Sequence, residues 1–269
     1  MFNKEVYLCS DIRLFMKVDC IPYEKTGYFS DLMCDYLKET STLQAYYNNF
    51  PKLQNFKKQL KEKAENFPME NRKVLVNSLN VQYKDSSLSK RTQNNISLLG
   101  EANTFTIVTG HQLNLFTGPL YFLYKILSVI NLTETLKKEH PKNNFVPIYW
   151  MATEDHDFDE INFFNFNGQK LQWNREVSGG VGRLQTDGLE EVFETFSNVL
   201  GNSKNAIELK NLFRKAYLEH NKLTDATRFL ANELFGEYGL VIVDGDDKEL
   251  KKLQIPYAKE DLFKHTAFN

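Results

Sequence analysis

The pattern of hydrophobic and polar positions divides the chain into a helical first third and a mixed remainder. Residues 28–99 are rich in Lys, Glu, Gln and Leu and contain few glycines. This composition predicts helices with one solvated face, including helices at about 69–84 and 88–99. Residues 1–28 mix aromatic, β-branched and charged side chains, which predicts an extended arm.

A strand, a helix and a second strand are predicted next. Residues 104–109 form a β-branched run that ends at Gly110, which is typical of a buried strand. Pro119 predicts the first position of a helix that runs to about residue 139. Because this helix is apolar nearly all round in its first half, we expect it to lie buried against a sheet. Residues 145–152 predict the second strand, so the three elements describe a parallel crossover unit.

The rest of the chain predicts a hairpin, two helices and a third strand. Asn167-Gly168 separates two apolar runs, and such a pair is typical of a two-residue hairpin turn with positive φ. We expect this hairpin to belong to a β insertion at about 161–187. Helices are predicted at 189–200 and 206–235, and a strand at 239–244 with Asp244 at its carboxyl end.

Composition excludes several classes of protein. The chain of 269 residues has 42% hydrophobic and 25% charged residues and a net charge of −2, without the basic stripe of a nucleic-acid-binding protein. No apolar run reaches the roughly 18 residues that a bilayer span requires. The three cysteines, Cys9, Cys20 and Cys34, have no paired spacing. They predict a reducing compartment, and we expect a cytoplasmic protein that binds neither nucleic acid nor membrane.

The loop at 109–119 is the first candidate site. It joins a strand to the amino end of a helix, where free N–H groups favour anions. Its glycines would let a ligand approach the backbone, and its polar side chains add donors. It matches neither the Walker phosphate-binding loop nor the glycine fingerprint of dinucleotide-binding folds. A generic anion or substrate loop and an ordinary glycine turn therefore both stay open. The candidate residues are Thr109, Gly110, His111, Gln112, Thr117 and Gly118.

The stretch at 153–160 is the second candidate site, with six ionisable groups among eight residues directly after a predicted strand. Groups so close repel one another, which shifts pKa values and prepares groups for acid–base chemistry. Substrate binding, helix capping and a magnesium, manganese or zinc site all remain open. The candidates are Glu154, Asp155, His156, Asp157 and Asp159.

Two further residues are weaker candidates. Arg183 follows a glycine-rich turn and could hold a carboxylate in a bidentate pair. Asp244 ends the third predicted strand, and the acidic stretch 244–247 could contact a ribose or a metal ion, although an acidic turn is common there.

Taken together, these motifs resemble the bacillithiol-biosynthesis cysteine-adding family. The resemblance rests on TGHQ at 109–112, LFTGPLY at 115–121, YKIL at 124–127, PIYWMATEDHDFDE at 147–160, VGR at 181–183 and GLVIVD at 239–244, in the family's order. It extends over essentially the whole chain. His111 stands where the family more often has a second glutamine, which favours hydrogen bonding over a unique acid–base role.

The resemblance implies an α/β fold with a Rossmann-like parallel sheet core, an N-terminal helical region and a β-hairpin insertion. We expect residues 1–99 to form the arm and helical region, and residues 100–269 to form an incomplete core. The chain ends inside a predicted helix without a cap. We therefore expect the amino-terminal half of a longer protein whose coiled coil mediates homodimers.

The resemblance also implies a cysteine ligase that joins L-cysteine to glucosaminyl-malate in the last step of bacillithiol biosynthesis. ATP, with Mg²⁺, is the suspected activator of the cysteine carboxylate, and no resident metal is expected. Glu154, Asp155, His156 and Asp157 are assigned to catalysis, and Asp244 to the cofactor. The residues assigned to the substrate are Thr109, Gly110, His111, Gln112, Thr117, Gly118, Arg183 and Asp159.

Two alternative functions remain open. One is a metal-dependent hydrolase that uses the loop at 154–160, and the other is a non-catalytic protein that binds a nucleotide or a sugar phosphate. All three functions require the loops at 109–119 and 153–160 to face one cleft.

Overall fold

The structure, a computed structural model, describes residues 19–267 and divides the chain into two compact units between Gln59 and Leu60. The first unit consists of short helices. They are α1 (Tyr23–Thr26), α2 (Asp31–Leu37), the 3₁₀ turns η1 (Ser41–Tyr46) and η2 (Leu53–Asn55), and the start of α3 (Phe56–Asn66).

The predicted arm at 1–28 is wrong where it can be examined. Residues 19–28 contain the helical turn α1, which begins after Pro22 and ends at Gly27 with φ 70°. Proline before the turn and a left-handed glycine after it favour a single helical turn. Cys20 and Cys34 are free thiols, as expected, whereas Cys9 lies outside the described residues.

Within the second unit, the two predicted helices are confirmed as α4 (Met69–Gln82) and α5 (Lys90–Leu98). Ser89 caps α5 by accepting a hydrogen bond from the N–H of Thr92. Both helices pack against the strand β5 (Val241–Asp244), and α5 also packs against the strand β2 (Asn144–Met151). The predicted division of the chain at residue 99 remains a prediction.

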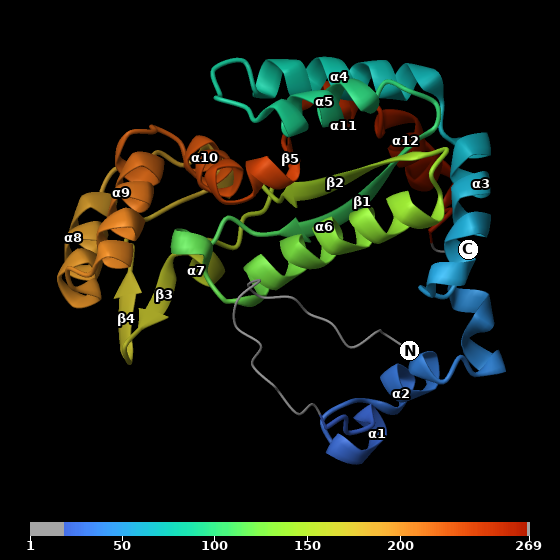
Figure 1. The fold of residues 1–269 in the computed structure, drawn as a ribbon, viewed down its shortest axis with the longest axis horizontal. Helices are drawn as coiled ribbons and strands as arrows, with labels where there is room; N and C mark the ends of the chain where they lie inside the picture. Colours follow the sequence, from blue (N-terminus) through green and yellow to red (C-terminus); the bar gives the residue numbers. More distant parts are fainter. Residues whose placement is uncertain (1–18, 268–269) are drawn as a thin grey trace. The chain divides into compact units, whose positions relative to one another are not determined.

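A three-stranded parallel sheet lies at the centre of this unit (Figure 1). Its order is β1 (Thr104–His111), β2 (Asn144–Met151) and β5 (Val241–Asp244). In the register His111 pairs with Met151, and Met151 pairs with Asp244. The three carboxyl ends therefore lie level, and the loops that follow them leave from one edge. The predicted α/β class is confirmed.

Pro147 is tolerated inside β2 because of where the third strand begins. β5 starts to pair at Ile148, so the proline lies in the part of β2 that has β1 as its only paired strand among the described residues. A missing N–H donor costs less where a strand has one neighbour than where it has two.

The crossover helix α6 (Tyr121–Glu139) packs on one face of the sheet, and α4 and α5 lie on the other (Figure 1). Phe122, Ile126 and Ile130 of α6 are buried. The helix packs against β1 and β2, as expected from its apolar first half, although Tyr121 and Tyr124 are 57% and 55% exposed. The helix also begins two residues after Pro119, which lies in the preceding turn.

An insertion follows β2, and it contains the predicted hairpin. The strands β3 (Phe163–Phe166) and β4 (Gln169–Gln172) pair antiparallel around Asn167 and Gly168, whose φ angles are 49° and 77°. The insertion continues through η4 (Val181–Arg183), α8 (Leu189–Leu200), α9 (Lys204–Leu218) and α10 (Leu223–Phe235).

The single helix predicted at 206–235 is wrong, because the chain breaks between α9 and α10. At the break the carbonyl of Asn221 accepts a hydrogen bond from Thr186, and the N–H of Leu223 donates to Leu184. These contacts come from a segment far away in sequence. Helical periodicity on both sides of the break could not reveal them.

The described chain ends with η5 (Gly236–Tyr238), α11 (Lys248–Lys252) and α12 (Ile255–Lys264) around and after β5. None of the helices in residues 19–267 combines the length and the apolar composition that crossing a membrane would take.

Candidate functional site

Gln112 joins the two loops that the sequence singled out. Its side-chain Nε2 donates to Oδ2 of Asp155 over 2.9 Å and to Oε2 of Glu160 over 2.8 Å. The loops after β1 and β2 are therefore in direct contact at the carboxyl edge of the sheet, as predicted. Both amide hydrogens of Gln112 are used inside the protein, so its carbonyl oxygen is the side-chain group left for a ligand.

Asp155 is the most firmly held carboxylate of this group. Its Oδ1 accepts the N–H of His156 over 2.7 Å and that of Asp157 over 3.3 Å. Burial acts to raise the pKa of Asp155, but the hydrogen bonds from Gln112 and from these two N–H groups outweigh it and hold the pKa below its usual value. Asp155 is thus a fixed negative charge at neutral pH, better suited to hold a cation than to accept a proton.

His156 and Asp157 lie on the open side of the same loop, with side chains 81% and 51% exposed. Ligand atoms of Asp155, His156 and Asp157 lie within 4.8 Å of one another, so the three could together hold a metal ion. The same placement lets the imidazole receive a proton between two carboxylates. The prediction that there is no resident metal has not been tested.

Asp159 and Glu160 belong to the short helix α7 (Phe158–Ile161) and are both exposed. Asp159 accepts a hydrogen bond of 3.4 Å from the amide of Asn162. Among the described residues neither carboxylate forms an ion pair with a lysine or arginine. Within residues 19–267, the loop between β2 and β3 therefore presents negative charge that no lysine or arginine pairs with.

The turn after Gln112 adopts an unusual backbone conformation. Phe116, Thr117 and Gly118 have φ angles of 50°, 71° and 59° in succession, around the 3₁₀ turn η3 (Leu115–Thr117). A β-branched residue such as Thr117 is rare in this region and is strained there. A Cβ atom on Gly118 would lie 2.4 Å from Cβ of Asn114, so this position requires glycine.

Phe116 anchors the turn to the insertion. Its ring centroid lies 4.7 Å from that of Phe213 and 4.8 Å from that of Phe164, and its N–H donates to the hydroxyl of Tyr217 over 3.2 Å. The aromatic packing of the insertion therefore offsets the strain and fixes the turn beside the acidic loop.

Thr109, Gly110 and His111, the candidates that precede Gln112, contact other parts of the protein than the acidic loop. Thr109 pairs in register with Tyr149, Gly110 lies beside the ring of Trp150, and the side chain of His111 contacts the rings of Tyr121 and Phe122 in α6. The His111 side chain therefore faces α6 and not the acidic loop. The assignment of these residues to substrate binding remains a prediction.

We predict that His111 makes the stability of the second unit depend on pH. Burial, reinforced by Lys125, lowers the pKa of His111 to about 4. Between pH 6.5 and 4 the unfolded chain binds a proton that the folded chain does not, so stability falls as the pH falls through this window. His111→Gln should weaken this dependence when urea unfolding midpoints are measured at a series of pH values.

Carboxylates with lowered pKa values, such as Asp155 and Asp246, also stabilise the folded protein less as the pH falls. This loss is the same in the wild type and in His111→Gln, so it does not affect the comparison. An identical slope between pH 6.5 and 4 in the two proteins would contradict the role given to His111.

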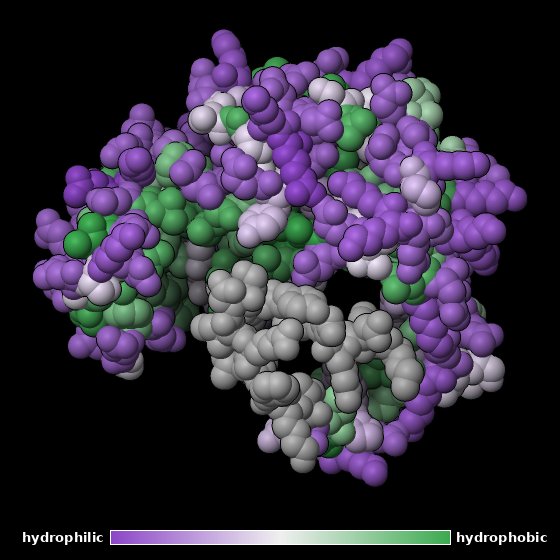
Figure 2. Space-filling view, viewed as in Figure 1, coloured by the Kyte–Doolittle hydropathy of each residue, from purple (hydrophilic) through white to green (hydrophobic). Residues whose placement is uncertain are grey.

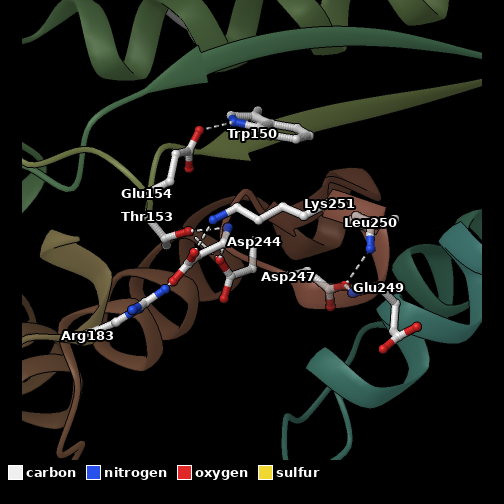
Figure 3. A network of polar contacts seen from close by, with 10 residues as sticks. Trp150, Thr153, Glu154, Arg183, Asp244, Asp247, Glu249, Leu250 and Lys251 are labelled. Atoms are coloured by element: carbon white, nitrogen blue, oxygen red, sulfur yellow. Dashed lines mark hydrogen bonds and ion pairs between the residues drawn. The ribbon is translucent and has the colours of Figure 1, made fainter. Parts of the chain in front are cut away.

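A second polar cluster lies where β5 ends (Figure 3). The hydroxyl of Thr153 donates to Asp244 and accepts the N–H of Asp246 over 2.8 Å. Asp246 pairs with Arg183 over 2.6 Å and also with Lys251. These contacts hold the pKa of Asp246 below its usual value, chiefly through the hydrogen bond from Arg183.

Arg183 and Asp244 are thus brought to the same edge as the acidic loop, but into this separate cluster. Both already have protein partners. The arginine side chain is 73% exposed, so it can still reach a ligand.

Glu154 lies between the two clusters. Its Oε1 accepts the indole N–H of Trp150 over 3.3 Å (Figure 3). A Cβ atom on Gly245 would lie 2.1 Å from Oε2 of Glu154, so the carboxylate packs directly on the glycine backbone after β5. Glu154 therefore faces the turn after β5, whereas Asp155 faces Gln112.

Several participants were missed from the sequence. Glu160 was part of the acidic stretch without being singled out, and its contact with Gln112 depends on α7 turning it back. Asp246 lies in the acidic stretch 244–247 that was considered, whereas Lys251 was missed and could have been noticed as a lysine behind an acidic strand end. Thr153 has no signal beyond its place after β2, although it is 1% exposed and bridges β2 to the β5 turn.

An open parallel sheet, with helices on both faces and polar loops gathered at its carboxyl edge, defines a Rossmann-like α/β domain, a class of fold whose ligands generally bind at that edge. The family model for the bacillithiol biosynthesis BshC N-terminal Rossmann-like domain matches residues 16–269. The chain belongs to this family.

Curated relatives agree with this assignment. The chain is similar to a protein of Flavobacterium johnsoniae named "putative cysteine ligase BshC", with 59% identity over 253 residues, which are 94% of this chain and 48% of the relative. Proteins of the same name from Christiangramia forsetii and Cytophaga hutchinsonii are 55% and 41% identical over 94% and 93% of this chain, and 48% and 46% of their own lengths. The chain spans about half the length of these relatives.

Proposed function

We propose that the chain provides the amino-terminal part of a cysteine ligase, which joins the carboxylate of L-cysteine to the amine of glucosaminyl-malate in bacillithiol biosynthesis. Membership of the family and the names of the relatives support this proposal. A cytoplasmic location and a homodimer of the full-length protein are part of it. The structural observation that supports the proposed site is the pair of hydrogen bonds from Gln112 to Asp155 and Glu160.

Both substrates carry an amino group, and the acidic loop suits such groups. Asp155, with its lowered pKa, would hold an ammonium group as a fixed countercharge. The attacking amine must lose a proton as its nitrogen bonds to the carboxyl carbon and a carbon–oxygen bond breaks. His156, exposed between Asp155 and Asp157, is the proposed acceptor of that proton.

An ionised carboxylate is a poor electrophile, and the proposal includes ATP, with Mg²⁺, as its activator. ATP would convert the cysteine carboxylate into an acylating group. The proposal puts the phosphates beside Arg183 and Lys251, whose positively charged side chains are 73% and 46% exposed. Gln112 is a poorer candidate, because both of its amide hydrogens are used and its neighbours are acidic.

The proposal is tested with the full-length gene product and with cells that lack the gene. We expect the purified protein to convert cysteine, glucosaminyl-malate and ATP to bacillithiol, and the cells to lose bacillithiol and accumulate glucosaminyl-malate, as measured by mass spectrometry. Unchanged bacillithiol in those cells would refute the proposal. Hydrolysis abolished by a chelator, without ligation, would favour the metal-dependent alternative.

A further inference from the structure

The described part of the first unit differs from the second unit in having no core of its own. None of residues 19–59 is buried, and every member of the hydrophobic core cluster belongs to the second unit. Ordering a segment costs conformational entropy, which buried apolar surface or cross-links must offset. Cys20 and Cys34 are free thiols, so no disulfide joins them. Residues 19–59 therefore need contacts outside their own segment to stay folded.

The apolar side chains of this unit gather around α2. On the helix they follow the spacing of a single face, and the members of this apolar face are Leu32, Met33, Tyr36 and Leu37. Tyr36 packs on the rings of Tyr47 and Phe50, with centroids 5.3 and 5.0 Å apart, so contacts within the unit take up only part of the face. Leu32 is 66% exposed, and Tyr28, just before the helix, is 90% exposed. Figure 2 shows hydrophobic side chains among hydrophilic ones at the surface in the region of α1 and α2.

Charge does not select the partner of the apolar face. The acidic residues of the described part are Asp19, Glu24, Asp31, Asp35 and Glu39, and the basic residues are Lys25, Lys38, Lys52, Lys57 and Lys58. These charges balance one another. The other side of α2 carries Asp31 and Asp35, which an anionic lipid surface or a nucleic acid would repel. An apolar face without net charge instead fits the apolar surface of a protein.

The observations favour a partner within the same polypeptide. The matching family model is that of an N-terminal domain, and the chain covers 48% of the Flavobacterium johnsoniae relative, so the relatives have a further, carboxyl-terminal half. A surface in the same polypeptide is present at a high effective concentration and keeps an apolar face covered at all times. A second copy would cover the face only above the dissociation constant of the dimer and would leave it open in the monomer.

We propose that the apolar face of α2, together with Tyr28, docks on the carboxyl-terminal half of the full-length protein. The contact joins the first unit to residues beyond position 269 and supplies the buried surface that residues 19–59 lack. This proposal depends on the family and on the exposed face, and it is independent of the ligation reaction.

Photo-crosslinking of the full-length gene product tests which surface covers the face. Irradiation of Leu32→p-benzoylphenylalanine should give cross-links to peptides beyond position 269 of the same polypeptide, as identified by mass spectrometry. Asp31→p-benzoylphenylalanine is the matched control, because this exposed residue lies on the other side of α2, and it should give far fewer of these cross-links. Equal yields in the two variants, cross-links to residues 60–269 alone, or a cross-linked dimer in place of the intramolecular product would overturn the proposal.

Limited digestion with trypsin tests the docking by its effect on stability. Release of the peptide 26–38, which needs cleavage after Lys25 and Lys38, should be roughly 10-fold faster in full-length Leu32→Asp than in wild type. Within the first unit alone this change is harmless, because Leu32 is largely exposed and the helix dipole favours an aspartate in the first turn. Faster cleavage therefore reports loss of docking.

Gln44→Asp is the control for digestion, because it places the same charge at another exposed position of the first unit, and it should be cleaved at the wild-type rate. Equal rates of release from wild type and Leu32→Asp would overturn the proposal.

Discussion

Asp155→Asn is expected to lower ligation turnover by roughly 100-fold or more, the range typical for loss of a charged group in contact with reacting groups. The substitution keeps the size of the side chain but removes its charge, and it turns an acceptor of the Gln112 hydrogen bond into a group that is half donor. The ammonium of the substrate would lose its fixed countercharge. Turnover is measured with the full-length gene product and compared with wild type at saturating substrates.

Asp85→Asn provides the control, because Asp85 is an exposed aspartate in the segment between α4 and α5, outside the site. Its turnover should match wild type. Wild-type turnover in Asp155→Asn would show that the loop after β2 does not hold a reacting group, and the proposed site would fall with it.

Phe116→Ala is expected to reduce the free energy of unfolding by about 3–5 kcal/mol, as is typical for a buried phenylalanine. Phe116 is 6% exposed and packs on four aromatic rings, those of Phe164, Phe196, Phe213 and Tyr217. Alanine would leave a cavity among them, and the positive φ at this position would persist. Urea unfolding followed by tryptophan fluorescence measures the loss, since Trp173 is buried in the same unit.

Phe116→Leu should cost less, about 1.5 kcal/mol or below, because it conserves most of the volume. Similar losses in both variants would point to the aromatic contacts themselves, whereas a loss below about 1 kcal/mol in Phe116→Ala would mean that the cluster closes around the gap. With so small a loss, contacts other than those of Phe116 would have to offset the backbone strain at 116–118.

The architecture was predictable where local pattern and tertiary structure agree. The β-branched runs gave β1 and β5, and Asn167-Gly168 fixed the hairpin because both residues adopt positive φ. The meeting of the two loops followed from topology alone, since parallel neighbours end at one edge. These inferences needed only periodicity and turn chemistry.

The parts that could not be predicted depend on contacts distant in sequence. The break between α9 and α10 is set by Thr186 and Leu184, more than one element away. The pairing of Arg183 with Asp246 joins the insertion to the turn after β5, and no local signal marks it. The sequence also did not show which face of the sheet His111 would occupy. Side chains alternate between the two faces along a strand, so the face depends on which residue begins the strand.

The placement of β1 has a practical consequence for handling this polypeptide. Within residues 19–267 the strand is hydrogen-bonded to β2 alone, and Val108 on it is 52% exposed. An unpaired row of backbone donors and acceptors beside an apolar side chain is a template for another strand. A concentrated sample of residues 19–267 is therefore expected to self-associate edge to edge, and a lysine in place of Val108 is the simplest means of keeping it monodisperse.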